Sequence, residues 1–319
     1  MADRSPRRVF TAAVDALAAQ VRQDTSILAA ILGGSLAHDT VWDKSDVDLV
    51  LVTIDEAKVS ADSISLYADG VNVHALMITR AAFRRLVQGS VQNSLMHSFL
   101  AKGRLLYTHD HTIAQLCETL HTLGDRDREL QLLRAAIGVV GPLYKAHKWL
   151  LTRGDLEYTA LWLLYTATPL AQIEVIGAGQ IAGREVIPEA LKLNPALFKI
   201  VYSDLLHQPV TRARVDAALS EVDRYLANRT PALFAPVFTY LREAGEARGC
   251  AEIEHHFSRN LGVDCVTSAC EYLADQKLIG KVSLPVRLTK RSTVAVQELA
   301  FVHVQQASDP FDEENWEPR

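Results

Sequence analysis

The feature that most constrains the fold of this 319-residue chain is a glycine turn followed, ten residues later, by two alternating aspartates. A short apolar run at residues 27–32 leads into Gly33-Gly34-Ser35, and Asp46-Val47-Asp48 opens a second apolar run. Both runs have the length of buried strands. Because strand side chains alternate between faces, Asp46 and Asp48 should project to the same side, with Cα atoms about 6 to 7 Å apart. We therefore expect a sheet that presents two carboxylates near a glycine turn.

This arrangement suits metal and phosphate chemistry. Mg²⁺ binds one or two carboxylates and completes its shell with phosphate oxygens and water. A glycine turn lets backbone amides approach a phosphate closely. A metal site beside a phosphate site supplies what the transfer of a nucleotidyl group needs. The alternative is a plain β-turn followed by a strand with two solvated aspartates.

The pattern resembles the signature of the polymerase β-like nucleotidyltransferase superfamily, in particular its minimal bacterial members. That signature combines a glycine turn ending in serine, a spacer of roughly a dozen residues and Asp-x-Asp between hydrophobic residues. Here the motif covers residues 33–52, and the wider domain resemblance extends to about residue 110. The resemblance implies that Asp46 and Asp48 are catalytic metal ligands. It also implies that the turn Gly33-Gly34-Ser35 binds the nucleotide, with Gly34 and Ser35 at the β- and γ-phosphates.

The chain departs from the family pattern at a third carboxylate. Most active members carry an Asp or Glu on a neighbouring strand, in an apolar run after a glycine. Here the run after Gly70 has His74 at that position, with Asn72 on the same face. A neutral histidine would serve Mg²⁺ less well than a carboxylate and would suit Mn²⁺ or Zn²⁺ better. We expect His74 to complete the catalytic set, and an active transferase and a catalytically degraded binder both stay open.

Three lysines are candidates for contact with the nucleotide phosphates. Lys44 lies in the spacer between the glycine turn and the aspartates. Lys145 and Lys148 lie in the first long helix after the α/β region, where related enzymes often use a lysine on the triphosphate. A solvated lysine is the alternative in each case, and no spacing rule selects between Lys145 and Lys148.

The middle of the chain is almost wholly helical in pattern. The expected helices are residues 126–152, 156–176, 195–207, 210–227 and 231–244. Asn194-Pro195 and Thr230-Pro231 are helix-start signals, a capping residue before a first-turn proline. In the resemblance this bundle corresponds to the helical domain that often follows a nucleotidyltransferase domain, and some such domains belong to the HEPN group. The HEPN ribonuclease signature is not found in the bundle, so ribonuclease activity is disfavoured.

The C-terminal region changes character again. Residues 246–307 show a helix, a turn, a helix and a β-hairpin, the order of a winged helix-turn-helix. Four basic residues in a stretch without acidic residues are candidates for nucleic-acid phosphates: Lys281, Arg287, Lys290 and Arg291. Winged helices also serve as protein-interaction modules, so DNA, RNA and a protein acceptor all stay open as partners.

Together the patterns predict an α+β multidomain protein. The expected parts are a small mixed-sheet nucleotidyltransferase domain (1–112), an all-helical HEPN-like bundle (113–245), a winged helix-turn-helix (246–307) and an acidic tail (308–319). The four cysteines show no C-x-x-C spacing, which argues against a zinc site or a redox pair. No signal peptide or apolar stretch of membrane-spanning length is evident, so we expect a cytoplasmic protein without a membrane partner.

The expected activity is metal-dependent transfer of a nucleoside monophosphate, AMP from ATP by default, although another nucleoside triphosphate would fit. Mg²⁺ or Mn²⁺ is the expected metal. The acceptor is a hydroxyl on a nucleic-acid end, a protein or a small molecule, and the winged helix favours a macromolecule. The alternative is a catalytically degraded regulatory protein that binds nucleotides or nucleic acid.

Overall fold

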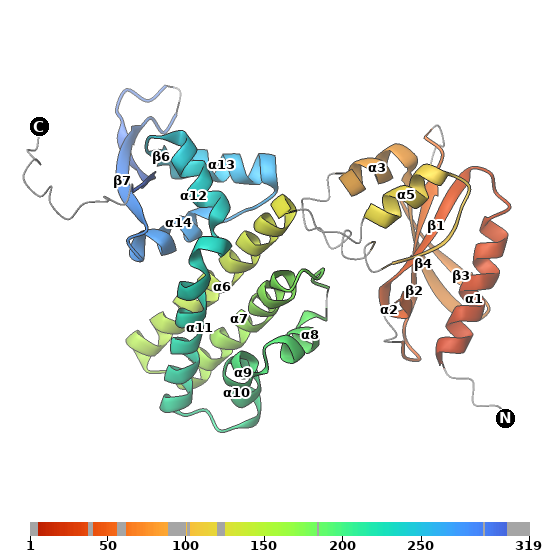
Figure 1. Cartoon of the computed structure of the whole chain (residues 1–319), viewed down its shortest axis with the longest axis horizontal. Coiled ribbons are helices and arrows are strands. Elements are labelled where there is room, and N and C mark those ends of the chain that lie inside the picture. The colour runs from red at the N-terminus through yellow and green to blue at the C-terminus, as the bar shows by residue number, and fades with distance from the viewer. Residues whose placement is uncertain are drawn as a thin grey trace, which may run out of the picture. The chain divides into compact units, whose positions relative to one another are not determined.

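The computed structural model describes residues 6–37, 41–55, 62–88, 100, 103–119, 125–183, 185–289 and 291–304. The chain divides into two compact units (Figure 1). The first consists of Met1–Leu132 and Ala167–His207, and the second of Leu133–Thr166 and Gln208–Arg319.

The first unit is built on a five-stranded sheet of order β3-β4-β2-β1-β5. Its strands are β1 (Ile27–Gly33), β2 (Val47–Thr53), β3 (Ser63–Ala68), β4 (Val71–Thr79) and β5 (Arg104–Thr108). Strands β2 and β4 run parallel, and the other neighbouring strands are antiparallel. The mixed sheet agrees with the α+β class expected from the sequence.

Helices cover both faces of this sheet (Figure 1). Val47, Leu49 and Leu51 of β2 join a core with α1 (Pro6–Val21) on one face. On the other face, Val50 and Val52 pack with α3 (Arg80–Gln88) and α5 (His111–Thr119). Period-two alternation therefore gives each face its own apolar core, and Asp48 lies on the same face as Val50.

Strands β3 and β4 form a hairpin around Asp69-Gly70. Both turn residues have positive φ, +48° and +87°, as a two-residue type I′ connection requires. Ala68 pairs with Val71, and the pairing continues without a shift along both strands. The two turn residues therefore set the register of the whole hairpin.

Helices make up most of the remainder. α6 (Asp125–Arg153) and α7 (Leu156–Gly177) each contribute residues to both units. The first unit also contains α8 (Val186–Leu193), α9 (Pro195–Phe198), the π-helical turn η1 (Lys199–Ser203) and α10 (Asp204–His207). The second unit also contains α11 (Arg212–Leu233) and α12 (Ala235–Ala244). The expected start at Asn194-Pro195 is confirmed, because the Asn194 side chain accepts a hydrogen bond from the Leu197 amide at 3.2 Å.

The expected helix start at Thr230-Pro231 is wrong. Both residues lie inside α11, which continues to Leu233. The buried Thr230 hydroxyl donates to the Leu226 carbonyl, four residues back, at 2.9 Å. Thr230 therefore acts as a helix-interior residue that satisfies its own hydroxyl, and the chain leaves α11 at Phe234 instead.

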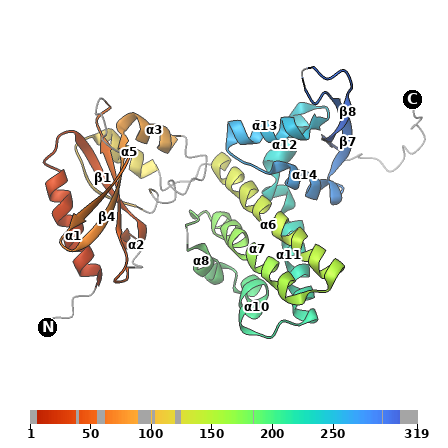
Figure 2. The ribbon, with the colours of Figure 1, turned by 180° about the vertical axis from the view of Figure 1, so that it is seen from behind.

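The C-terminal part of the second unit contains two helices and a small sheet. Its helices are α13 (Cys250–Leu261) and α14 (Val266–Asp275). Its sheet has the order β6-β8-β7, with β6 (Arg248–Gly249), β7 (Ile279–Val286) and β8 (Val296–His303). Figure 2 shows β7 and β8 beside α14. The elements follow the expected order of helix, turn, helix and hairpin, while the tail at 308–319 lies outside the described residues.

Within the described part of the chain, every helix is too short or too polar to cross a bilayer.

Candidate active site

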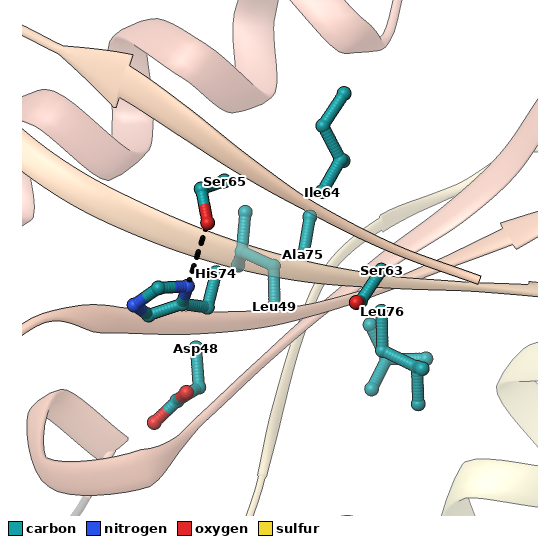
Figure 3. A pocket seen from close by; sticks show the side chains of 9 residues that line it. Asp48, Leu49, Ser63, Ile64, Ser65, His74, Ala75 and Leu76 are labelled. Carbon is teal, nitrogen blue, oxygen red and sulfur yellow. Dashed lines mark hydrogen bonds between the residues drawn. The ribbon is translucent and has the colours of Figure 1, made fainter. Parts of the chain in front are cut away.

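A row of paired residues crosses four strands of the sheet next to the glycine turn. Backbone pairing sets Asp48 of β2 between Gly33 of β1 and His74 of β4. His74 is paired in turn with Ser65 of β3. Because paired residues point to the same face, the side chains of Asp48, His74 and Ser65 share one side of the sheet (Figure 3).

An open pocket of about 180 Å³ lies over this row. Three strands line it, through residues 48–50 of β2, 63–65 of β3 and 74–76 of β4 (Figure 3). Pockets that enclose a whole small ligand usually measure about 300–1,000 Å³. This pocket therefore has room for part of a ligand, such as a phosphate group or a hydrated ion.

Both ring nitrogens of His74 have a polar side chain within 3.1 Å. Nε2 lies 3.0 Å from Oδ2 of Asp46, which directly precedes β2. Nδ1 lies 3.1 Å from the Ser65 hydroxyl oxygen. The His74 and Asp46 side chains are 52% and 51% exposed, so the pair is open to solvent. The two contacts orient the ring even though half of its surface is accessible.

Gly34 brings the turn and the aspartates together. It opens the short helix α2 (Gly34–Ala37) with φ +66°, a left-handed conformation. A Cβ at this position would collide with Oδ2 of Asp48. Glycine therefore allows both the backbone conformation and the close approach of the carboxylate. The glycine turn and the Asp-x-Asp motif are in direct contact, as a joint phosphate and metal site would require.

The donor set of Asp46, Asp48 and His74 fits a divalent metal chemically, with two carboxylates and an imidazole on one face. Among the residues that the structure describes, no three or more His, Cys, Asp or Glu side chains are grouped as around a metal ion. A metal that arrives with a nucleotide does not need such a group, because Mg²⁺ is usually held by one or two carboxylates plus substrate phosphates and water. The residues present therefore fit a metal that is shared with a phosphate ligand.

The structure describes no contact between the row of paired residues and the other residues predicted to bind the nucleotide. Ser35 belongs to α2, but its side chain is outside the described part of the chain. Lys44 is exposed, with Nζ 5.8 Å from the centre of the Trp42 ring, a cation–π contact. Lys145 and Lys148 are exposed on α6, in the second unit. The roles of Ser35 and these lysines stay predictions.

Sequence reasoning missed Ser65, although a signal for it was present. A two-residue turn at Asp69-Gly70 pairs residue 68 with residue 71. Counting outward from the turn then places Ser65 opposite His74. Aspartate followed by glycine is a typical two-residue hairpin turn, and the register that such a turn fixes would have indicated Ser65 as the partner of His74.

The nucleic-acid candidates lie in and after strand β7. Lys281 is exposed on β7, and Arg287 and Arg291 are exposed in the connection from β7 to β8. Lys290 lies outside the described residues. These positions agree with a basic hairpin, but no contact tests their role.

Helix α14, the second helix of the helix-turn-helix order, is poorly suited to reading a nucleic-acid groove. It has no Lys or Arg, and its two charged residues are Glu271 and Asp275. The Tyr144 hydroxyl of α6 donates to Oδ2 of Asp275 at 2.9 Å. Burial and the neighbouring Asp275 raise the pKa of Tyr144, so this hydroxyl stays protonated and keeps the contact. Any nucleic-acid contact is therefore better placed on the hairpin than on α14.

Neither a protein-family model nor a curated protein sequence matches this chain. A solved structure does match, that of a nucleotidyltransferase-like protein from Exiguobacterium sibiricum. The TM-score is 0.63 at 18% sequence identity, and the match covers 92% of this chain and 99% of that chain. This chain has a nucleotidyltransferase-like fold. The resemblance carried by the glycine turn and the two aspartates is thus confirmed at the level of the fold, whereas the HEPN-like and winged-helix assignments stay predictions.

Proposed function

We propose that this protein is a metal-dependent nucleotidyltransferase that moves a nucleoside monophosphate, AMP from ATP by default, to a hydroxyl of a macromolecular acceptor. The observation that carries the proposal is the packing of Asp48 against Gly34, which joins the glycine turn and the carboxylates in one site. The fold shared with a nucleotidyltransferase-like protein supports it.

The chain's own residues have separate tasks in this reaction. Asp46 and Asp48 hold Mg²⁺ or Mn²⁺, and the bound ion neutralises charge on the triphosphate. Gly33, Gly34 and Ser35 bind the phosphates through the turn. The acceptor oxygen forms a bond to the α-phosphorus, the bond to pyrophosphate breaks, and the hydroxyl proton passes to solvent water, while His74 completes the site beside the two aspartates. Catalysis rests mainly on positioning and charge neutralisation.

The remaining assignments form part of the same proposal. Residues 113–245 are the HEPN-like helical bundle and residues 246–307 a winged helix-turn-helix that recruits the acceptor in the cytoplasm. The three-stranded sheet β6-β8-β7 and the order of α13 and α14 support the winged helix. The basic hairpin supports DNA or RNA as the partner, with a protein acceptor as the alternative.

A second candidate is a regulatory protein that binds nucleotide or nucleic acid without turnover. The observation that favours it is His74 at the position where most active relatives carry a carboxylate. The two candidates differ in whether the α-phosphate of ATP is transferred.

The test is incubation of the full chain with ATP labelled at the α-phosphate, Mg²⁺ or Mn²⁺, and DNA, RNA or protein acceptors. We expect label on a macromolecule, reduced about 100-fold or more when Asp46→Asn and Asp48→Asn are combined, because the charge neutralisation is lost. Asp43→Asn is the matched control, an exposed aspartate of the same spacer, and should transfer label normally.

Two other outcomes would contradict parts of this proposal. ATP binding without transfer to any acceptor favours the regulatory protein. Metal-dependent nucleotide binding that is unchanged in the double aspartate variant shows that the site has been assigned to the wrong residues.

A further inference from the structure

The contact between His74 and Asp46 has the spacing of two neighbouring ligands of one metal ion. Their Nε2 and Oδ2 atoms are 3.0 Å apart. In an octahedral shell with metal–ligand distances of about 2.1 Å, adjacent ligand atoms are also about 3.0 Å apart. Both side chains are half exposed, so an ion and its remaining ligands can reach them from solvent.

Ser65 is placed to leave Nε2 of His74 available to such an ion. Its hydroxyl oxygen lies 3.1 Å from Nδ1 of His74, directly across the β3–β4 ladder. A histidine that binds a metal almost always donates its other ring N–H to a hydrogen-bond acceptor, which fixes the tautomer and the ring orientation. When Nδ1–H donates to Ser65, Nε2 keeps its lone pair on the side of Asp46.

We propose that His74 Nε2 and Asp46 are a nitrogen–oxygen ligand pair that makes this site prefer a first-row transition ion such as Mn²⁺ to Mg²⁺, with Ser65 as the positioning residue. The proposal rests on the proposed function for the assignment of a metal to this site. Imidazole is a better ligand for transition ions than for Mg²⁺, which favours all-oxygen shells. Asp48 is paired with His74 on the neighbouring strand and lies on the same face of the sheet.

The first experiment measures Mn²⁺ binding to the full chain by electron paramagnetic resonance, with Mg²⁺ as the competitor. We expect Mn²⁺ to bind about tenfold more tightly than Mg²⁺ or better. Pulsed measurements should show ¹⁴N coupling from the imidazole. His74→Asp makes the donor set all-oxygen, so the ¹⁴N coupling should disappear and the preference for Mn²⁺ should fall by about tenfold.

The second experiment tests the positioning role with two exposed strand serines. Ser65→Ala removes the acceptor for Nδ1–H. It should weaken Mn²⁺ binding about tenfold, which is the lower end of the range for such partners, because the serine is exposed. Ser283→Ala is the matched control, since Ser283 is also an exposed serine in a strand, β7, and is paired with Leu299 outside the pocket. It should leave Mn²⁺ affinity unchanged. Thermal unfolding verifies that both variants fold.

Three results would overturn the proposal: no ¹⁴N coupling in the wild type with Mn²⁺ bound, an unchanged metal preference in His74→Asp, or equal effects of the two serine variants. Label transfer separates this outcome from the proposed function. Transfer supported by Mg²⁺, with no change of metal preference in His74→Asp, keeps the function and overturns the ligand pair. Nitrogen-coupled Mn²⁺ without transfer to any acceptor keeps the ligand pair and overturns the function.

Discussion

Gly34 and Gly70 have similar backbone conformations in different surroundings. Their φ values are +66° and +87°, both in the left-handed region. A Cβ at Gly34 would meet the Asp48 carboxylate, whereas nothing lies within 4 Å of a Cβ at Gly70. Substitution at Gly70 therefore tests the backbone conformation alone, whereas substitution at Gly34 also tests the close approach of the Asp48 carboxylate.

We predict that Gly34→Ala and Gly70→Ala each lower the free energy of unfolding by about 1–2 kcal/mol, because an L side chain is strained in this conformation. Only Gly34→Ala should also weaken metal-dependent nucleotide binding, by about tenfold or more, because the carboxylate of Asp48 must move away. Urea unfolding and a nucleotide titration measure the two effects. Equal nucleotide affinity in the two variants would contradict the packing of the turn against Asp48.

For single residues, the sequence predicts the sheet face on which a side chain lies better than it predicts which other side chain it contacts. Strand alternation predicts that Asp46 and Asp48 share one side, whereas the candidate third position, His74, follows from the family resemblance. The contact of His74 with Asp46 was out of reach, because β2 and β4 are parallel strands joined through β3. Their register is set by packing on both faces of the sheet and not by a turn between them.

At the scale of elements, side-chain contacts connect α6 to two other helices of the second unit. His147 Nε2 of α6 lies 3.0 Å from Oδ2 of Asp223 on α11. Tyr144 of α6 reaches Asp275 of α14. The hydrogen bond to Asp223 raises the pKa of His147, although partial burial acts in the opposite direction.

We predict that Asp223→Asn destabilises the protein more at pH 5.5 than at pH 8.5. The raised pKa of folded His147 stabilises the fold fully below the unfolded value of about 6.5, and this stabilisation is lost as pH rises through the folded pKa. The pair is partly solvated, so the pH-dependent difference should be below about 1 kcal/mol. Urea unfolding at the two pH values measures it.

Asp216→Asn is the matched control for this pair. Asp216 lies on the same helix, is similarly exposed and pairs with Arg212, which does not titrate in this range. Its effect should be the same at both pH values. A pH-independent effect of Asp223→Asn would show that the His147 contact does not contribute to stability as described.

Two helix boundaries show why a short sequence signal does not by itself predict where a helix starts. Asn194 and Thr230 both precede a proline, but Asn194 has φ −138° and caps the next helix through its side chain. Thr230 is buried inside α11 and bonds backwards to Leu226. The same two-residue signal therefore has opposite outcomes, and the difference is burial, which depends on distant parts of the chain.

At the scale of the whole molecule, the net charge is −5. Overall charge therefore does not attract nucleic acid, and any binding must come from a local basic surface. We predict that combining Arg287→Glu with Arg291→Glu weakens nucleic-acid binding and reduces the slope of log affinity against log salt by about two, one per lost phosphate contact. Fluorescence anisotropy of labelled DNA and RNA at several salt concentrations measures this slope.

The control combines Arg153→Glu with Lys192→Glu, which changes the net charge equally at exposed positions outside the hairpin. Equal weakening by both pairs would mean that total charge, and not the hairpin, governs binding. No weakening by either pair would remove the hairpin from the proposed acceptor site.

The overall class of the molecule was predictable from local patterns, and the two compact units are a finding of the structure. The alternating strands and the long helical stretch were sufficient for an α+β assignment. The grouping of Ala167–His207 with the N-terminal sheet depends on packing between residues far apart in the chain. Composition changes along the sequence carry no information about such grouping.

The turn at Asp69-Gly70 makes the site depend on chain length as well as on residue identity. Ser65 and His74 meet because nine positions separate them around a two-residue turn. A slip of one residue would set Leu66 against His74 and send Ser65 to the opposite face of the sheet. The spacing between these two residues therefore matters as much as their identities, because an insertion that shifts the register would abolish the contact without altering either residue.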